Sequence, residues 1–193
     1  LWSWLRFAHG GARFPPRVAP RSSGSYPLLS LALGASAYRT LALAAARALG
    51  TLPVNVVAPI RHYLEPGDSV PANVHVTDLL PAHKLGGLVD AAVIHGGQGT
   101  VQTACATGVP FVGMGLQPEQ TWHVRACERR GNAIAVSPKD VSKSLFIHAV
   151  QRVLTEPGFR TTADEVRDAY ANEDGAAAAA RLIETEIATR ARP

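Results

Sequence analysis

Residues 91–120 read AAVIHGGQGTVQTACATGVPFVGMGLQPEQ, and they carry the clearest structural signal in the chain. The apolar run at their start is expected to form a strand that ends on His95 and leads directly into a glycine cluster. A helix is expected to begin within that cluster, and a second apolar strand then precedes an acid–amide pair, Glu119 and Gln120. A strand, a glycine turn and a helix start in this order can hold a phosphate on backbone N–H groups.

Short apolar runs alternate with amphipathic stretches on both sides of this segment. Strands are expected at 27–33, 54–58, 74–77, 91–94, 109–114 and 133–136. Helices are expected at 36–49, 81–88, 99–107, 119–130, 161–171 and 175–188, and another is expected to follow 138–140 and to end near 154. The helix at 175–188 is expected to pack on a neighbour, and a frayed tail is the alternative. Such alternation is typical of a parallel sheet with helices on both faces. We therefore expect an α/β fold with a doubly wound, Rossmann-like parallel sheet, in which the carboxyl ends of the strands form one ligand-binding rim.

The composition fits one domain of a globular protein. The chain has 193 residues, of which 47% are hydrophobic and 18% charged, so it can bury a core and does not have the composition of a disordered segment. The net charge is +4, and no dense Lys/Arg cluster is interleaved with aromatic residues, so we expect no nucleic-acid surface. Apolar runs fall short of the about 20 residues of a membrane helix, and no secretory signal is visible. We therefore expect a cytoplasmic protein without an integral membrane segment.

The only two cysteines, Cys105 and Cys127, lie in predicted helices and show neither the spacing of metal ligands nor a disulfide framework. We expect both to be small buried side chains in a reducing compartment. The glycine turn has no D-x-D-like acidic motif near it. The sequence therefore predicts no metal site and no cofactor.

The first 25 residues differ from the rest. They begin with an aromatic group, Trp2, Trp4 and Phe7, and continue rich in Pro, Gly, Arg and Ser, which is typical of a linker. We expect a linker or N-terminal arm over 1–25, the remnant of a preceding domain, and one folded domain over 26–193. A short native arm that folds back on the core is the alternative.

The glycine cluster has the features of a phosphate cradle. Glycines at the rim let backbone N–H groups approach a phosphate without a Cβ in the way. A helix that starts near Gln98 adds unpaired N–H groups and the positive end of its dipole. His95 and Thr100 can each donate a side-chain hydrogen bond to a phosphate oxygen. A G-G-x-G turn alone, however, is also used in tight strand–helix connections for its geometry only.

The acid–amide pair suits a sugar. The Glu119 carboxylate can accept hydrogen bonds from vicinal hydroxyls, and the Gln120 amide can both accept and donate. The alternative is a solvated helix start, where an acid also suits the helix dipole.

Together these motifs resemble the donor-binding half of family 1 glycosyltransferases, which have the two-domain GT-B architecture. The shared signature is H-x-G, a few small residues, a helix, G-V-P, an apolar strand and an acid–Gln pair, and the likeness covers about residues 26–153. It implies a nucleotide-sugar-binding domain over 26–193. A nucleotide-diphosphate sugar is then the donor substrate.

The resemblance also implies roles for individual residues. His95 and the turn hold the diphosphate, and Glu119 and Gln120 hold the transferred sugar. The remaining positions it suggests are diphosphate contacts at Gly97, Gln98, Gly99 and Thr100, a second glycine turn at Gly34 helped by Ser36, and a base-cupping loop at Leu79, Leu80 and Pro81.

The chain departs from the family pattern at several positions. Leu79 stands where the plant branch stacks a Trp on the base, and Ala32 and Ala35 replace serines around the first glycine turn. Thr103 stands where a carboxylate often holds the ribose hydroxyls, and this neutral residue hints at a dTDP-linked donor rather than a UDP-linked one. His123 stands where an Asn commonly follows the acid–Gln pair.

The family likeness implies the donor domain of an inverting, metal-independent glycosyltransferase. In that family the catalytic base and most of the acceptor pocket lie in an N-terminal domain, so we expect such a domain or a partner chain, and we assign no catalytic residue here. Histidines 9, 62, 75, 83 and 148 are candidates by residue type only and are rejected. The alternatives are a non-catalytic nucleotide-sugar-binding module, one subunit of a split transferase, or a nucleotide-sugar epimerase of the same architecture.

Overall fold

The computed structural model describes residues 28–32, 39–172 and 174–190. The predicted arm over 1–25 and the proposed contacts Gly34 and Ser36 lie outside these ranges. Within them, no helix is long and apolar enough to cross a membrane.

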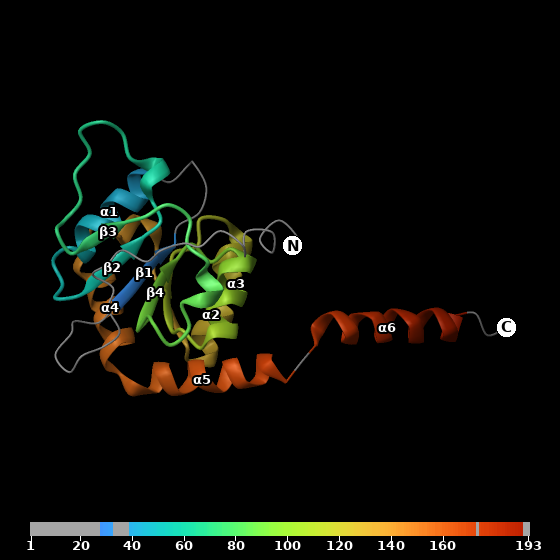
Figure 1. The fold of residues 1–193 in the computed structure, drawn as a ribbon. Helices are drawn as coiled ribbons and strands as arrows, with labels where there is room; N and C mark the ends of the chain where they lie inside the picture. Colours follow the sequence, from blue (N-terminus) through green and yellow to red (C-terminus); the bar gives the residue numbers. More distant parts are fainter. Residues whose placement is uncertain (1–27, 33–38, 173, 191–193) are drawn as a thin grey trace.

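The core of the fold is a six-stranded parallel sheet with the order β3-β2-β1-β4-β5-β6 (Figure 1). Its strands are β1 (Leu28–Ala32), β2 (Asn55–Ala58), β3 (Val74–Val76), β4 (Ala91–Ile94), β5 (Phe111–Gly113) and β6 (Ala133–Ala135). The central pair, β1 and β4, is in register with Ala32 opposite Ile94. The chain reverses its direction of growth between these two strands, which is where doubly wound folds bind ligands. The predicted fold class is confirmed.

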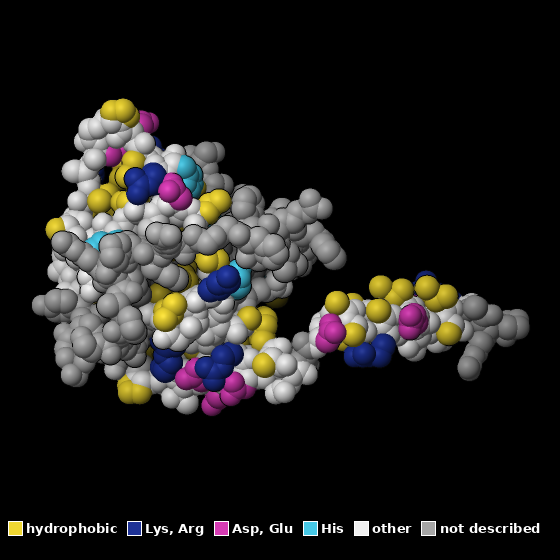
Figure 2. All heavy atoms as spheres, viewed as in Figure 1, with side chains coloured by type: hydrophobic (Ala, Val, Ile, Leu, Met, Phe, Trp, Pro, Cys, Tyr) yellow, Lys and Arg dark blue, Asp and Glu magenta, His cyan; other side chains and the backbone are white. Residues whose placement is uncertain are grey.

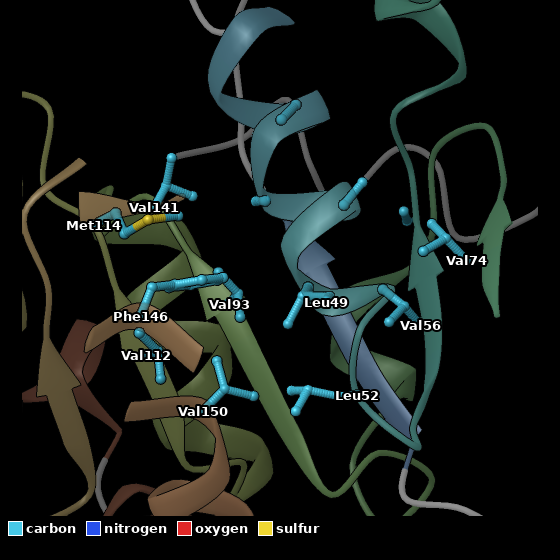
Figure 3. Close-up of a cluster of buried hydrophobic side chains, with 14 of the residues drawn as sticks. Leu49, Leu52, Val56, Val74, Val93, Val112, Met114, Val141, Phe146 and Val150 are labelled. Atoms are coloured by element: carbon cyan, nitrogen blue, oxygen red, sulfur yellow. The ribbon is translucent and has the colours of Figure 1, made fainter. Parts of the chain in front are cut away.

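Helices cover both faces of the sheet, as predicted. They are α1 (Arg39–Leu49), α2 (Gln98–Thr107), α3 (Pro118–Arg130), α4 (Ser144–Thr155), α5 (Pro157–Ala171) and α6 (Gly175–Arg190), with short 3-10 turns η3 (Arg61–Tyr63), η4 (Ala82–Lys84) and η5 (Pro138–Asp140). Side chains alternate along β4, so that Val93 joins the core under α1 and α4 (Figure 3), whereas Ile94 joins the core under α2 and α3. The two-sided burial explains why this strand is apolar at every position.

Glycine ends the two helices that flank β5. Gly108 after α2 and Gly131 after α3 have φ angles of 65° and 102°, a left-handed conformation that a residue with a Cβ adopts only at a cost. The next strand begins within a few residues of each. Because the helices end at these glycines, only short connections are needed to return the chain to the sheet.

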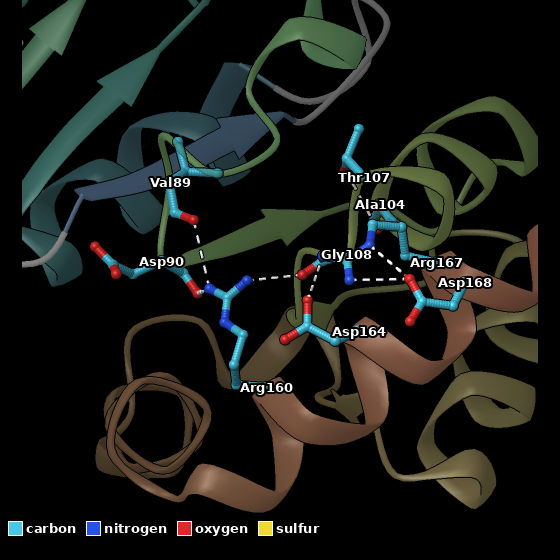
Figure 4. Close-up of polar contacts among 9 residues, drawn as sticks. All are labelled: Val89, Asp90, Ala104, Thr107, Gly108, Arg160, Asp164, Arg167 and Asp168. Carbon is cyan, nitrogen blue, oxygen red and sulfur yellow. Dashed lines mark hydrogen bonds and ion pairs between the residues drawn. The ribbon is translucent and has the colours of Figure 1, made fainter. Parts of the chain in front are cut away.

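Arg160 on α5 fastens the end of the sheet where β4 begins. Its guanidinium donates to the carbonyls of Val89 and Asp90, just before β4, and to that of Gly108 after α2 (Figure 4). Arg160 therefore links the segment before β4 to the segment after α2, and we call this set of hydrogen bonds the Arg160 clamp. The clamp lies at the opposite end of β4 from His95.

Three helix predictions need correction. Only η4 forms where a helix over 81–88 was expected, because Gly87 takes a φ of 72° and breaks the run. Helix α5 begins four residues earlier than predicted, since Pro157 fits the first turn of a helix. Helix α6 forms, but it extends away from the body of the domain (Figure 1) and has no buried residue, so the expected packing on a neighbour is absent from the described ranges. Its apolar side chains instead gather along one exposed side (Figure 2).

Candidate functional site

The turn between β4 and α2 is the centre of the candidate site. Gly96 has a φ of 79°, and a Cβ built there would lie 2.6 Å from the Val124 side chain and 2.8 Å from the Gln120 carbonyl oxygen. Only glycine therefore lets this turn lie directly against α3. The close approach brings the residues that follow β4 and those that begin α3 to the same side of the molecule.

Helix α2 begins at this turn without a side-chain cap. Its N-cap residue, Gly97, is extended, with φ −60° and ψ 145°, and makes no side-chain hydrogen bond to the helix. The first N–H groups of a helix have no partner within it, and they lie at the positive end of the dipole. A Cβ built on Gly99 would meet no atom of the described residues within 4 Å, its own helix backbone and chain neighbours apart. The helix start can therefore be approached closely from outside.

His95 lies beside the same turn. Its Nε2 atom is 2.5 Å from the position that a Cβ on Gly97 would occupy, and the residue is partly exposed. The imidazole thus lies beside the start of α2, where the sequence predicts that it donates a hydrogen bond to a phosphate oxygen.

The hydroxyls of the two threonines in the predicted site are engaged with the backbone. The Thr100 hydroxyl donates to the Gly97 carbonyl over 2.8 Å, and the Thr103 hydroxyl donates to the Gly99 carbonyl over 2.8 Å. Either hydroxyl can donate to a ligand only by turning away from its present acceptor.

Glu119 and Gln120 lie in the first turn of α3. The Gln120 Oε1 atom accepts a 3.0 Å hydrogen bond from the Leu116 N–H and so ties the segment before α3 to the first turn of the helix, a role that the sequence did not predict. Its amide Nε2 can still donate. Glu119 is largely exposed, with its carboxylate 3.9 Å from Nδ1 of His123.

Close glycine packing holds α3 at the rim. A Cβ on Gly113, at the end of β5, would collide with the Val124 side chain, and one on Gly115 would collide with Thr121. Because Val124 also contacts Gly96, one side chain of α3 rests on the ends of both β4 and β5. The acid–amide pair is therefore fixed relative to the glycine turn.

His123 joins the two parts of the site. Its Nδ1 atom lies 3.3 Å from the Gly96 carbonyl oxygen, and its side chain is only 19% exposed. Sequence reasoning noted this residue only as a departure from the family pattern. The one signal available was its position four residues after Glu119, which places both on one helix face.

The predicted base-cupping loop follows β3. Leu79 is 61% exposed, whereas Leu80 and Pro81 are partly buried. An exposed leucine at the rim is compatible with the aliphatic contact predicted there.

An open hollow of about 670 Å³ lies elsewhere in the described part of the chain. It is lined by residues at the amino ends of β2 and β3, including Asn55 and Asn73. The Asn73 amide is occupied by the carbonyls of Leu49, Leu52 and Val54. This hollow is therefore part of the connection after α1 and carries none of the predicted site residues.

The two cysteines meet between α2 and α3. Both are free thiols, Cys105 buried and Cys127 partly buried, in the helices predicted for them. A hydrogen bond with Cys127 lowers the pKa of Cys105, and the same contact, together with burial, raises the pKa of Cys127. In the described ranges, no three His, Cys, Asp or Glu side chains group as a metal site would require.

Comparisons with known proteins agree on one family. Residues 44–185 match the model of the erythromycin biosynthesis protein CIII-like C-terminal domain. The chain is 39% identical over 144 residues to the 4'-demethylrebeccamycin synthase of Lentzea aerocolonigenes, a match that covers 75% of this chain and 34% of that protein. It is 30% identical over 149 residues to a PGL/p-HBAD biosynthesis rhamnosyltransferase of Mycobacterium bovis, with 76% and 32% covered.

A solved structure agrees on the fold. The spinosyn rhamnosyltransferase SpnG complexed with thymidine diphosphate matches with a TM-score of 0.74 at 22% identity, covering 89% of this chain and 48% of that one. The fold and the matched range define the class: this is the C-terminal half of a GT-B glycosyltransferase architecture. The chain belongs to the EryCIII-like C-terminal domain family. It spans about one third of the length of the curated relatives, 34% and 32% for the two above.

Proposed function

We propose that this chain is the donor-binding half of an inverting, metal-independent glycosyltransferase, which transfers a sugar from a nucleoside diphosphate to an acceptor hydroxyl. One observation carries the proposal: Gly96 in the turn after β4 lies in contact with Gln120 at the start of α3. A diphosphate held at the turn then has its sugar end within reach of Glu119 and Gln120. Membership of the family supports the same reading.

The diphosphate is held by charge and hydrogen bonding. Its oxygens are surrounded by the N–H groups of Gly97, Gln98 and Gly99, by the positive end of the α2 dipole and by the His95 ring. These groups stabilise the negative charge that develops on the diphosphate as it leaves, without a metal ion or a resident cofactor. Thr100 contributes when its hydroxyl turns from the Gly97 carbonyl toward a phosphate oxygen, which can only accept.

The sugar is held by the pair at the start of α3. The exposed Glu119 carboxylate accepts hydrogen bonds from sugar hydroxyls. Gln120 acts as a donor through Nε2, because its Oε1 atom already accepts from Leu116. The two side chains therefore take complementary roles on neighbouring hydroxyls.

Transfer itself requires a group from outside this chain. The acceptor oxygen forms a bond to the anomeric carbon as the bond from that carbon to the diphosphate oxygen breaks, and in-line attack inverts the configuration. The acceptor proton passes to a base that we assign to an acceptor-binding N-terminal domain or a partner chain.

We propose a dTDP-linked donor. Thr103 carries no charge, and its hydroxyl donates to the Gly99 carbonyl, so no carboxylate at this position accepts from a ribose 2′-hydroxyl. A deoxyribose has no such hydroxyl to satisfy. The thymidine diphosphate held by SpnG, a protein of the same fold, supports this choice.

Calorimetric titration of the chain with dTDP, UDP, ADP and GDP tests the proposal. We expect dTDP to bind, and to bind more tightly than UDP. Absence of binding by every nucleoside diphosphate would refute the donor site, and a marked preference for UDP would refute the role of Thr103. Binding is common to a donor domain and to a non-catalytic module, so sugar transfer in the presence of the acceptor-binding part separates the two.

A further inference from the structure

His123 has an unusual position for a residue outside the predicted site. It lies on α3 with its side chain 19% exposed, and the edge of the neighbouring Trp122 ring packs against it at 5.5 Å between centroids. Its Nδ1 atom is 3.3 Å from the Gly96 carbonyl oxygen and 3.9 Å from a Glu119 carboxylate oxygen. One ring nitrogen thus faces both the glycine turn and the acidic member of the pair.

The neighbours of Nδ1 determine which way this hydrogen bond runs. A backbone carbonyl and a carboxylate are both acceptors, so a bond to either requires a hydrogen on Nδ1. The Nδ1–H group therefore donates to the Gly96 carbonyl, with the Glu119 carboxylate nearby favouring the same arrangement.

Holding that carbonyl also sets the direction of an N–H group. The peptide unit between Gly96 and Gly97 is planar and trans, so its C=O and N–H point in opposite directions. When His123 fixes the Gly96 carbonyl toward α3, the Gly97 N–H is fixed facing away from α3. Glycine on both sides of this peptide allows it to rotate more freely than other residues would, so an external restraint has a large effect here.

We propose that His123 is a positioning residue of the donor site: its Nδ1–H group locks the Gly96–Gly97 peptide so that the Gly97 N–H is aimed for the diphosphate. This inference rests on the proposed donor function. It assigns His123 no contact with the ligand. His123 acts through the backbone of the turn, and its approach to Glu119 ties the orientation of the diphosphate end to that of the sugar end.

The test uses the geometry of amide side chains. The Asn side-chain nitrogen can take the place of Nδ1, whereas the longer Gln side chain places its amide nearer the position of Nε2. The variants are H123N, H123Q and H123L, with H148L as a matched control, because His148 is an exposed histidine on α4, at the other face of the sheet. The measurement is the dissociation constant of dTDP for each chain, with melting temperatures recorded in parallel.

We expect H123L to bind dTDP about fivefold more weakly, the effect of losing one neutral hydrogen bond. H123N should stay within about twofold of the unaltered chain, H123Q should resemble H123L, and H148L should bind normally. Rescue by Asn but not by Gln is an outcome that a general packing role would not produce. If H123L does not fold, the comparison of H123N with H123Q decides alone.

Two outcomes overturn the inference and leave the donor site standing. One is H123L binding dTDP as tightly as the unaltered chain, and the other is H123Q restoring affinity as well as H123N. If the unaltered chain binds no nucleoside diphosphate, the proposed function fails and this inference fails with it.

Discussion

Replacing Gly99 with alanine separates ligand contact from folding at the start of α2. Among the described residues, a Cβ at this position meets no atom outside its own helix backbone and chain neighbours within 4 Å, so they offer no steric resistance to it. Alanine in place of an exposed helical glycine stabilises by about 0.4–1 kcal/mol. For a chain of this size that corresponds to a melting temperature about 1–4 °C higher.

The same methyl group should oppose binding. If the diphosphate lies over the Gly99 backbone, the new Cβ keeps it away from the N–H groups, and G99A should lose about 1–3 kcal/mol of dTDP affinity. Calorimetry and thermal melting measure the two effects on one sample. Gly158 supplies the control, because it is also the second residue of a helix, α5, and its Cβ position is open in the same way among the residues that the structure describes. G158A should match the gain in stability and leave dTDP binding unchanged.

The expected signature is therefore a more stable protein that binds less well. If G99A keeps full affinity for dTDP while its melting temperature rises, the ligand does not approach the start of α2. If both G99A and G158A lose affinity equally, the effect is not local to the site. Either result would refute the placement of the diphosphate.

Three further substitutions test other parts of the account. Gln120→Ala should weaken binding of an intact dTDP-sugar more than of free dTDP, and equal losses for both ligands would contradict the sugar-facing role. It should also destabilise the fold by about 1 kcal/mol, because the Leu116 N–H loses its hydrogen-bond acceptor. Arg160→Ala should lower the free energy of unfolding in denaturant by about 2–3 kcal/mol, because the carbonyls of Gly108 and Asp90 lose a charged donor. The affinity for dTDP should not change, and a loss of that affinity without a loss of stability would contradict a structural role. The Glu65 N–H and the Arg39 guanidinium lower the pKa of Asp68. The ionised carboxylate therefore stabilises the fold fully above pH 3.8, and this stabilisation is lost as the pH falls through the lower pKa that Asp68 has in the folded chain. Asp68→Asn should make the stability less sensitive to acid in that range, and an unchanged dependence of stability on pH would count against the pairing.

The sheet could be predicted from the sequence because burial on both faces leaves a simple pattern. Each strand is short, apolar and followed by an amphipathic stretch, and β4 was predicted with its observed bounds. Helix ends were predictable where a glycine lies directly after the helix, as at Gly131. The stretch before Gly87 was predicted to be helical because Pro81 suits a helix start, but Gly87 adopts a left-handed φ of 72° and ends the run.

The contacts within the site were not predictable, since they depend on how the turn after β4 meets helix α3. The fit of Gly96 against Val124 and the hydrogen bond from His123 join residues that lie 27 or 28 positions apart. The hydrogen bond between the Leu116 N–H and Gln120 depends on the path of the chain at Leu116, which no local pattern specifies. The position of α6 was not predictable for a different reason. Its large apolar side chains Leu182, Ile183 and Ile187 are exposed, so no burial against the described part of the chain fixes where the helix lies.

The most direct test of the account is an amide-resolved NMR titration of the chain with dTDP and then with a dTDP-sugar. We predict that dTDP shifts the backbone amides of Gly97, Gly99 and Thr100, and that the dTDP-sugar adds shifts at Glu119 and Gln120. Shifts confined to the hollow around Asn73, or shifts at the turn with none at the start of α3 for the sugar nucleotide, would contradict a single site formed by both.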